Sequence, residues 1–232
     1  MAVYLIEFRF HGYAKKYART LIYDIARKFN VDGVTKKRAV PHITLFGPFT
    51  TRNERQVVST VASIGQKFGL VPFSLKDFNY FNKKTNKVIY LDIEPSHELE
   101  ELRWELAKNL HPITNTRSAF DKYKKFYFHS TIAFRDIDGK FSNIVEYIKT
   151  IEKPIIKQHL LRITILKNGK ILYEYDLIQK RLLDRREARS KYYWKKTIQQ
   201  FKNMCNEFEC EVESDDNFIH SIWEKIKSAI GF

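Results

Sequence analysis

Two short stretches of the 232-residue chain repeat one pattern of chemically active side chains. The first is His42-Ile43-Thr44-Leu45, and the second is His129-Ser130-Thr131-Ile132. Both read histidine, any residue, threonine, aliphatic residue. If each stretch is a β-strand, its histidine and threonine share one face of the sheet, because side chains alternate along a strand. The other five histidines of the chain lack the pattern.

Two imidazoles that face one phosphate group can divide the work of acid and base, because histidine titrates near neutral pH. One activates the attacking hydroxyl or water, and the other protonates the leaving oxygen. Threonine hydroxyls can donate hydrogen bonds to the non-bridging phosphate oxygens. We therefore interpret His42 and His129 as a catalytic pair and Thr44 and Thr131 as phosphate donors, a chemistry that requires no metal ion and no cofactor. Either histidine alone could equally be a structural residue bonded to a nearby carbonyl.

The predicted secondary structure places the two motifs at equivalent positions of a repeated unit. Apolar, β-branched runs alternate with segments of helical spacing, in the order β-α-β-α-β near residues 3–81 and again near 87–167. Asn53 and Ser96 are predicted helix N-caps, and Asn168-Gly169 predicts a hairpin between strands near 159–166 and 170–178. The motif strand is the second strand of each unit.

These elements predict an α+β fold of two lobes, near residues 1–83 and 84–178. We expect the lobes to be related by a pseudo-twofold axis, with antiparallel-rich sheets that line a central cleft. Residues 179–232 are predicted to form a helical C-terminal extension. Its first apolar stripe consists of Trp194, Ile198, Phe201, Cys205 and Phe208, and a second runs from Ile219 to Ile230.

The two motifs resemble those of the two-histidine (2H) phosphoesterases, a family that includes 2′-5′ RNA ligases and RNA 2′,3′-cyclic phosphodiesterases. The stretch from Pro41 to Phe49 is especially similar to the first motif of the family. The resemblance covers about residues 1–178 and implies a duplicated α/β fold, catalytic His42 and His129, and phosphate-binding Thr44 and Thr131. Relatives often carry arginine five residues after the second histidine, where this chain has Phe134 followed by Arg135. Strand alternation would place Arg135 on the face of His129, so it is a further candidate phosphate ligand.

The charge of the chain favours a polyanionic partner. Lys and Arg number 41 against 27 Asp and Glu, a net charge of +14, which promotes association with nucleic acid. A basic loop precedes each motif, and nearby aromatic rings could stack on unpaired bases. The alternative is that these loops are ordinary solvated segments. The candidate RNA contacts are Lys36, Lys37, Arg38, Arg117, Lys122, Tyr123, Lys124, Lys125, Tyr127 and Phe46.

Several classes of protein are excluded by composition. No apolar run of about 18 residues is present, so a transmembrane helix is not expected, and the N-terminus does not read as a signal peptide. With only Cys205 and Cys210, a disulfide framework is not expected, and the cytoplasm is the expected compartment. A hydrophobic content of 44% is enough for a folded core.

The expected activity is hydrolysis of a 2′,3′-cyclic phosphate on RNA or a nucleotide to a 2′-phosphate, with reversible 2′-5′ ligation at the same site. Two alternatives remain open: a non-catalytic RNA-binding protein on the same fold, and a hydrolase of a small cyclic nucleotide or ADP-ribose cyclic phosphate. We expect residues 1–178 to act without the extension. A monomer is expected, and a dimer through the helical extension, or a basic RNA-guiding helix within it, is the alternative.

Overall fold

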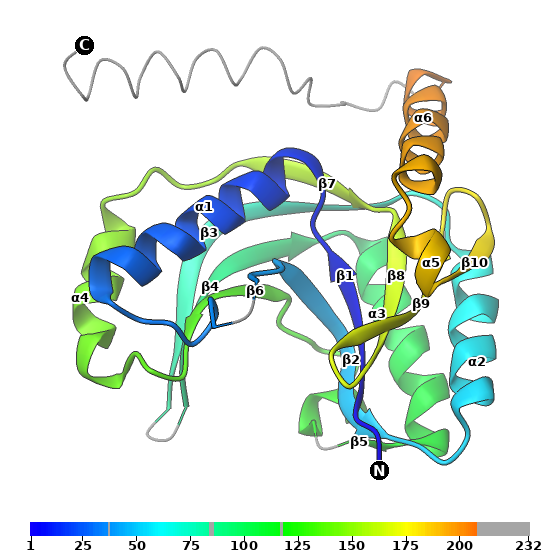
Figure 1. Ribbon diagram of the computed structural model, residues 1–232, viewed down its shortest axis with the longest axis horizontal. Coiled ribbons are helices and arrows are strands. Elements are labelled where there is room, and N and C mark those ends of the chain that lie inside the picture. Colours follow the sequence, from blue (N-terminus) through cyan, green and yellow to red (C-terminus); the bar gives the residue numbers. More distant parts are fainter. Residues whose placement is uncertain (37, 84–85, 117, 208–232) are drawn as a thin grey trace.

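Two antiparallel sheets form the framework of the computed structural model, which describes residues 1–36, 38–83, 86–116 and 118–207 (Figure 1). The first sheet has six strands in the order β10-β9-β8-β1-β2-β5, and the second has four in the order β6-β4-β3-β7. In the first sheet the strands are β10 (Arg181–Asp184), β9 (Lys170–Asp176), β8 (Arg162–Lys167), β1 (Tyr4–Arg9), β2 (His42–Thr50) and β5 (Asn115–Thr116). In the second sheet they are β6 (His129–Phe134), β4 (Asn86–Pro95), β3 (Val71–Lys83) and β7 (Ile156–Leu160).

Helices follow the strands in the predicted order. They are α1 (Gly12–Phe29), α2 (Glu54–Lys67), α3 (His97–Leu110), α4 (Phe141–Lys149), α5 (Arg185–Ala188) and α6 (Lys191–Glu207). Both predicted N-caps are confirmed, because Asn53 accepts from the backbone N–H of Gln56 at 3.1 Å and Ser96 accepts from that of Leu99 at 3.2 Å. The fold is therefore α+β, as the alternation of elements predicted.

Each half of the chain contributes a strand to the sheet that carries the motif of the other half. The first half contributes β3, and the second half contributes β8. The two sheets contain the matching orders β8-β1-β2 and β3-β4-β6, so each motif strand has an equivalent neighbour. Lobes with a boundary at residues 83/84 are therefore wrong, since β3 lies in the second sheet and β8 and β9 lie in the first. The pairing of β3 with β4 accounts for the exchange of β3, because strands separated by very few residues readily pair antiparallel.

The strand predicted near residues 159–166 is in fact two strands. β7 ends at Leu160 and pairs with β3, whereas β8 begins at Arg162 and pairs with β1. The chain thus crosses between the sheets at Leu161, which is fully buried. The hairpin at Asn168-Gly169 is confirmed between β8 and β9, and both turn residues have positive φ, 50° and 73°.

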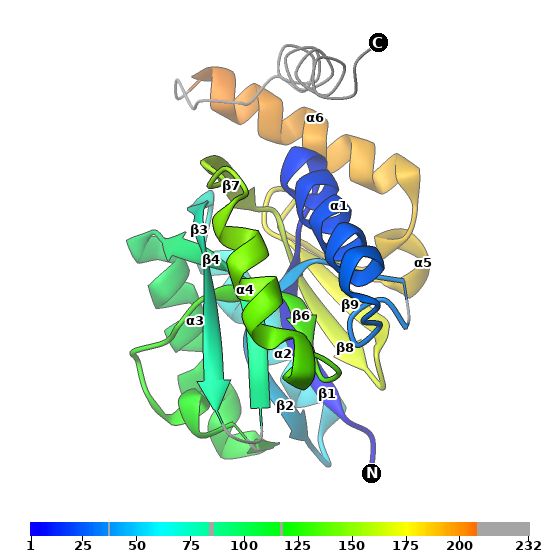
Figure 2. The same cartoon turned by 90° about the vertical axis from the view of Figure 1, so that its left-hand side faces the viewer.

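The helices pack against the sheets from different sides (Figures 1 and 2). α2 and α3 lie side by side, α2 against β8 and β9 and α3 against β2 and β3. α1 contacts β6, and its Phe29 ring meets the ring of Tyr147 on α4 at 5.5 Å. Among the described residues, no helix has the length and apolar character needed to cross a membrane.

The extension is joined to the body more closely than a boundary at residue 178 implies. β10 adds a strand to the first sheet, and Phe201 and Cys205 of α6 pack on Leu161. The predicted stripe is confirmed from Trp194 to Cys205; Phe208, Cys210 and the second stripe lie outside the described residues. The predicted boundary is therefore wrong, since the sheet continues past residue 178.

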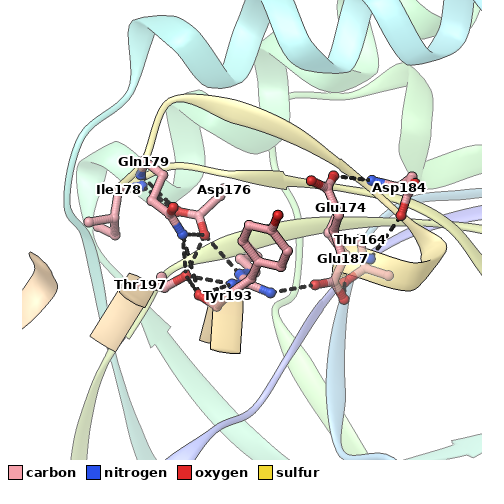
Figure 3. A network of polar contacts seen from close by, with 10 residues as sticks. Thr164, Glu174, Asp176, Ile178, Gln179, Asp184, Glu187, Tyr193 and Thr197 are labelled. Atoms are coloured by element: carbon pink, nitrogen blue, oxygen red, sulfur yellow. Dashed lines mark hydrogen bonds and ion pairs between the residues drawn. The ribbon is translucent and has the colours of Figure 1, made fainter. Parts of the chain in front are cut away.

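A buried polar network fixes α6 to β8 and β9 (Figure 3). Arg162 donates through Nε to Asp176 at 2.9 Å and through Nη2 to the backbone oxygen of Tyr193 at 3.0 Å. The Thr197 hydroxyl accepts from Arg162 and donates to Asp176. Asp176 and Thr197 are fully buried. The charge of Arg162 is paired by Asp176 and Glu174 of β9, and α6 adds two neutral hydrogen-bond acceptors to this buried pair.

Candidate active site

The two motif strands contact each other where the sheets meet, as β2 and β6 do in Figure 1. β6 is an edge strand, and β5 pairs with β2 only at Phe49 and Thr50, so the motif end of β2 has no strand on that side. In both motifs the histidine and threonine are half-buried, and the residues between and after them are buried. This burial pattern matches the predicted alternation of faces.

Each motif histidine makes the same hydrogen bond, to the backbone carbonyl of the residue two positions before it. Nδ1 of His42 donates to the backbone oxygen of Val40 at 2.8 Å, and Nδ1 of His129 donates to that of Tyr127 at 2.9 Å. A carbonyl oxygen only accepts, so Nδ1 must carry the proton in both rings. Nε2 is then the nitrogen left to accept or release a proton.

Aromatic rings surround His129. Phe81 meets its imidazole edge-on at 5.3 Å between ring centroids, and Tyr90 lies at 5.1 Å. Burial lowers the pKa of His129 below its usual value, the Tyr127 carbonyl opposes that shift, the charge of His42 lowers the pKa further, and Asp92 raises it. His129 is therefore neutral at pH 7, and the two imidazoles are close enough to interact electrostatically.

A carboxylate lies beside His42. Oε2 of Glu7 is 3.8 Å from Nε2 of His42, and Oε1 of Glu7 accepts from Nε of Arg9 at 2.6 Å. The Glu7 side chain is only 3% exposed. Glu7 therefore lies between the imidazole of His42 and the guanidinium of Arg9.

The threonines lie beside these groups with their hydroxyls available. In the strand register Thr44 is opposite Glu7, and Thr131 is opposite Tyr90. Neither hydroxyl makes a hydrogen bond to any part of the chain that the structure describes. Two half-buried donors without an internal partner can bind an external acceptor such as a phosphate oxygen.

Sequence analysis missed the residues on the neighbouring strands. Arg9 lies opposite His42, and Asp92 opposite His129. The run Tyr4–Arg9 did contain a signal, since Glu7 and Arg9 are the two charged residues of an otherwise uncharged strand and share one face. Nothing in the sequence gave the register that brings them, or Phe81 and Tyr90, to the motifs.

Arg135 lies just beyond the second motif strand. β6 ends at Phe134, and Arg135 has a φ of 77°, so strand alternation does not apply to it. Its side chain is exposed, with the guanidinium 5.2 Å from the ring of Phe134. The argument that placed Arg135 on the face of His129 therefore fails, and its role as a phosphate ligand stays a prediction.

Phe46 is not a stacking surface either. It is fully buried and packs against Phe49 at 5.2 Å between ring centroids. α3 packs against β2. The Phe46 prediction is wrong because the ring is part of the hydrophobic core and cannot reach a base.

The predicted basic loops are largely exposed. Lys36, Arg38, Lys122, Lys125 and Tyr123 reach solvent, as does Tyr127, whose side chain is 58% exposed. Lys124 is less available because it pairs with Glu101, and Lys125 lies 5.9 Å above the ring of Tyr127. Lys37 and Arg117 lie outside the described residues.

Buried polar anchors hold both loops in place. Arg103, which is fully buried, donates to the backbone oxygen of Phe120 at 2.8 Å and pairs with Asp121 at 3.3 Å. Asp121 in turn accepts from the backbone N–H of Gly47 in β2 at 3.1 Å. The loop before β2 is tied to the second sheet by Asp136, which accepts from the backbone N–H groups of Asp32 and Gly33 at 2.6 and 3.0 Å. The loop before β6 is thus bound to β2, which carries the first motif. The loop before β2 is bound to the turn that follows β6, the strand of the second motif.

Metal-binding groups are not clustered in this region. Across residues 1–36, 38–83, 86–116 and 118–207, no group of three or more His, Cys, Asp and Glu side chains is placed to hold a metal ion.

Known proteins resemble the chain in fold and in sequence pattern. Solved structures that resemble the chain include LigT of E. coli complexed with 3′-AMP, at 14% identity and a TM-score of 0.44, covering 78% of this chain and 92% of LigT. A second is described as a phosphoesterase, at 13% identity and a TM-score of 0.45, with the same two coverages. No match was found among curated proteins. A family model described as the 2′-5′ RNA ligase superfamily matches residues 22–167, a segment that includes both histidine motifs, and the chain belongs to this superfamily.

Proposed function

We propose that the protein hydrolyses 2′,3′-cyclic phosphates on RNA ends or nucleotides to 2′-phosphates, without a metal ion. The main support is the equivalence of the two motifs. Each presents an imidazole whose Nδ1–H is fixed by a carbonyl two residues earlier, and each has an unbonded threonine hydroxyl on the same face. Structural histidines would not require this arrangement twice, on two strands in contact.

The environments of the two histidines suggest their roles. His129, neutral because burial lowers its pKa, accepts a proton from the attacking water through Nε2. The oxygen of that water bonds to phosphorus, and the bond from phosphorus to the 3′-oxygen breaks. His42, whose Nε2 lies 3.8 Å from Oε2 of Glu7, acts as the general acid and gives a proton from Nε2 to the leaving 3′-oxygen. Thr44 and Thr131 donate to the non-bridging oxygens, on which charge accumulates in the transition state.

The same geometry accounts for ligation. If a 5′-hydroxyl replaces water, His129 removes its proton and the product is a 2′-5′ phosphodiester. Exclusion of water and the concentration of the 5′-hydroxyl end decide which reaction dominates. We further propose that the protein acts as a monomer in the cytoplasm, which agrees with a sequence that contains only two cysteines.

The test is an assay of the purified protein in EDTA with 2′,3′-cyclic mononucleotides and with oligoribonucleotides that end in a cyclic phosphate. We expect turnover, with a 2′-phosphate identified by ³¹P NMR. A 3′-phosphate product, or activity restored only by added metal, would contradict the proposal. RNA binding without turnover would instead support a non-catalytic RNA-binding protein.

A further inference from the structure

A basic pocket lies beside the first motif and is completed by the C-terminal extension. It has a volume of about 450 Å³ and is formed by the start of α1, the loop before β2 and the junction of α5 and α6. The extension supplies residues 188–191 and Trp194 to its wall, all beyond the segment that the superfamily matches. Its cationic lining residues are Arg9, Lys15, Arg19, Arg38, Arg189 and Lys191.

Most of these cations have no anionic partner. Arg9 pairs with Glu7, but within the described part of the chain the other five form no ion pair with a carboxylate. The one acid in the lining, Glu174, is held by Arg162 at 3.3 Å and accepts from Thr164 at 3.1 Å. The positive charge that faces the pocket is therefore not neutralised within the described protein.

The cations also act on one another. Burial lowers the pKa of Lys15, and the charges of Arg19, Arg38 and Arg9 lower it further. In addition, Nε of Arg19 is buried without a hydrogen-bond partner. Like charges held together are unfavourable until an anion joins them, so this cluster is typical of a site for a negatively charged ligand.

Two helices begin at this pocket, and both add positive potential. α1 starts at Gly12 and has no side-chain cap, and α6 starts at Lys191. Neither has an acidic residue in its first turn. The free backbone N–H groups of a helix N-terminus favour phosphate groups.

The pocket is continuous with the motif at one end and with α1 at the other. Arg9 in its wall lies opposite His42 in the sheet, and Val40 accepts the hydrogen bond from His42. Gly12, Lys15 and Arg19 also line an open hollow of about 710 Å³ along α1, which includes Lys16 and Arg27. A basic track thus extends from His42 along the helix, which suits a strand with several phosphates better than a single nucleotide.

We propose that this pocket binds phosphodiester groups of the RNA strand whose end reacts at His42 and His129. The inference rests on the proposed function and adds the substrate class, an RNA chain rather than a cyclic mononucleotide. It also gives the extension a role, because Arg189 and Lys191 complete the pocket. Removal of either positive charge weakens binding of the RNA strand, whereas the reacting phosphate can still bind to Thr44 and Thr131.

The test compares two charge-matched double variants of the full chain. Arg189→Ala/Lys191→Ala removes two pocket cations, and Lys196→Ala/Lys202→Ala removes two exposed lysines of α6 that do not line the pocket. Binding of a fluorescent single-stranded 12-nucleotide RNA is measured by anisotropy at several salt concentrations. We expect the pocket variant to weaken binding about tenfold and to reduce the salt slope by roughly 1, since each phosphate contact to a single strand contributes about 0.7; the control should change less than twofold.

A second readout is kcat/KM for a cyclic-phosphate oligomer relative to a cyclic mononucleotide. The pocket variant should lower this ratio about tenfold. Equal losses in both double variants, or an unchanged ratio, would overturn the proposal. Because RNA binding does not require turnover, weaker binding in an inactive protein would support the pocket while the proposed function failed. Arg38→Ala, on the opposite wall, repeats the test if the double variant does not fold.

Discussion

Two nitrogen atoms carry the proposed chemistry, Nε2 of His42 and Nε2 of His129. In His42→Ala or His129→Ala we expect kcat to fall by about 10² or more, since general acid or base catalysis is lost. The unfolding midpoint should change little, because both side chains are only half-buried. Steady-state kinetics and urea unfolding measure the two quantities. The control is His97→Ala, an exposed histidine at the start of α3, and near-normal turnover in His42→Ala would place proton transfer elsewhere.

The threonines should contribute less than the histidines. Thr44→Ala or Thr131→Ala removes one donor to the phosphate, for which we expect a loss of about 10-fold to 10²-fold in kcat/KM. Thr→Ser at the same position keeps the hydroxyl and should restore most of the activity. A serine variant as slow as the alanine variant would show that the methyl group, and so packing, is what matters.

The pH dependence should report on the surroundings of His129. Burial lowers its pKa, and a base must be neutral, so the acidic midpoint of kcat/KM should lie below about 6.5. Phe81→Ala admits water and should move this midpoint up, whereas Phe81→Leu should not. Asp92→Asn removes a carboxylate that raises the pKa and should move the midpoint down. Shifts in the reverse directions would rule out His129 as the base.

The motifs could be found from sequence because a two-residue spacing is local. Alternation alone places His42 and Thr44 on one face, and the structure agrees. Glu7 and Asp92 act on the same histidines through pairing between strands, which depends on register. The face predicted for Arg135 had no structural basis, since alternation was extended one residue beyond the end of β6. Local periodicity is thus informative only inside an element.

At the scale of elements, order was predictable and pairing was not. The β-α-β-α-β order follows from periodicity and capping residues, each confined to a few positions. Which sheet receives β3 or β8 depends on whether pairing with a strand nearby in the sequence is more favourable than pairing with a distant one. The bulged contact of β1 with β2 also shows that irregularities shift register locally.

Substitution of Gly33 tests whether the loop before β2 has to stay close to β6. A Cβ built on Gly33 would lie 1.8 Å from the backbone oxygen of Phe134, so Gly33→Ala forces this loop away from β6. We expect a loss of about 1–3 kcal/mol in the free energy of unfolding and reduced kcat/KM, since the loop leads to His42. Gly139→Ala is the control, because no atom lies within 4 Å of its Cβ. Equal stability of the two variants in urea would show that the loop adjusts freely.

For the whole molecule, the first sheet, α6 and the basic track form one structure. Sequence periodicity predicted α6, but it gave no sign that the helix covers the crossing point at Leu161 or provides hydrogen-bond acceptors for Arg162. Those roles depend on residues far apart in the chain. The expectation that residues 1–178 act without the extension stays a prediction, and its stability cost follows from the loss of β10 and of the partners of Arg162 on α6.

Substitution of Thr197 tests how much the C-terminal extension contributes to the free energy of unfolding of the protein. Its buried hydroxyl links Arg162 to Asp176, so Thr197→Val leaves both charged groups with a missing partner. We expect a loss of about 1–3 kcal/mol in the free energy of unfolding, and Thr197→Ser should recover it. Residues 1–178 alone should lose about 3 kcal/mol or more, since Arg162 loses both of its hydrogen-bond acceptors on α6 and Leu161 becomes exposed. Urea unfolding of the three proteins beside the full chain measures this, and a fragment that unfolds as late as the full chain would show that the body is stable without α6.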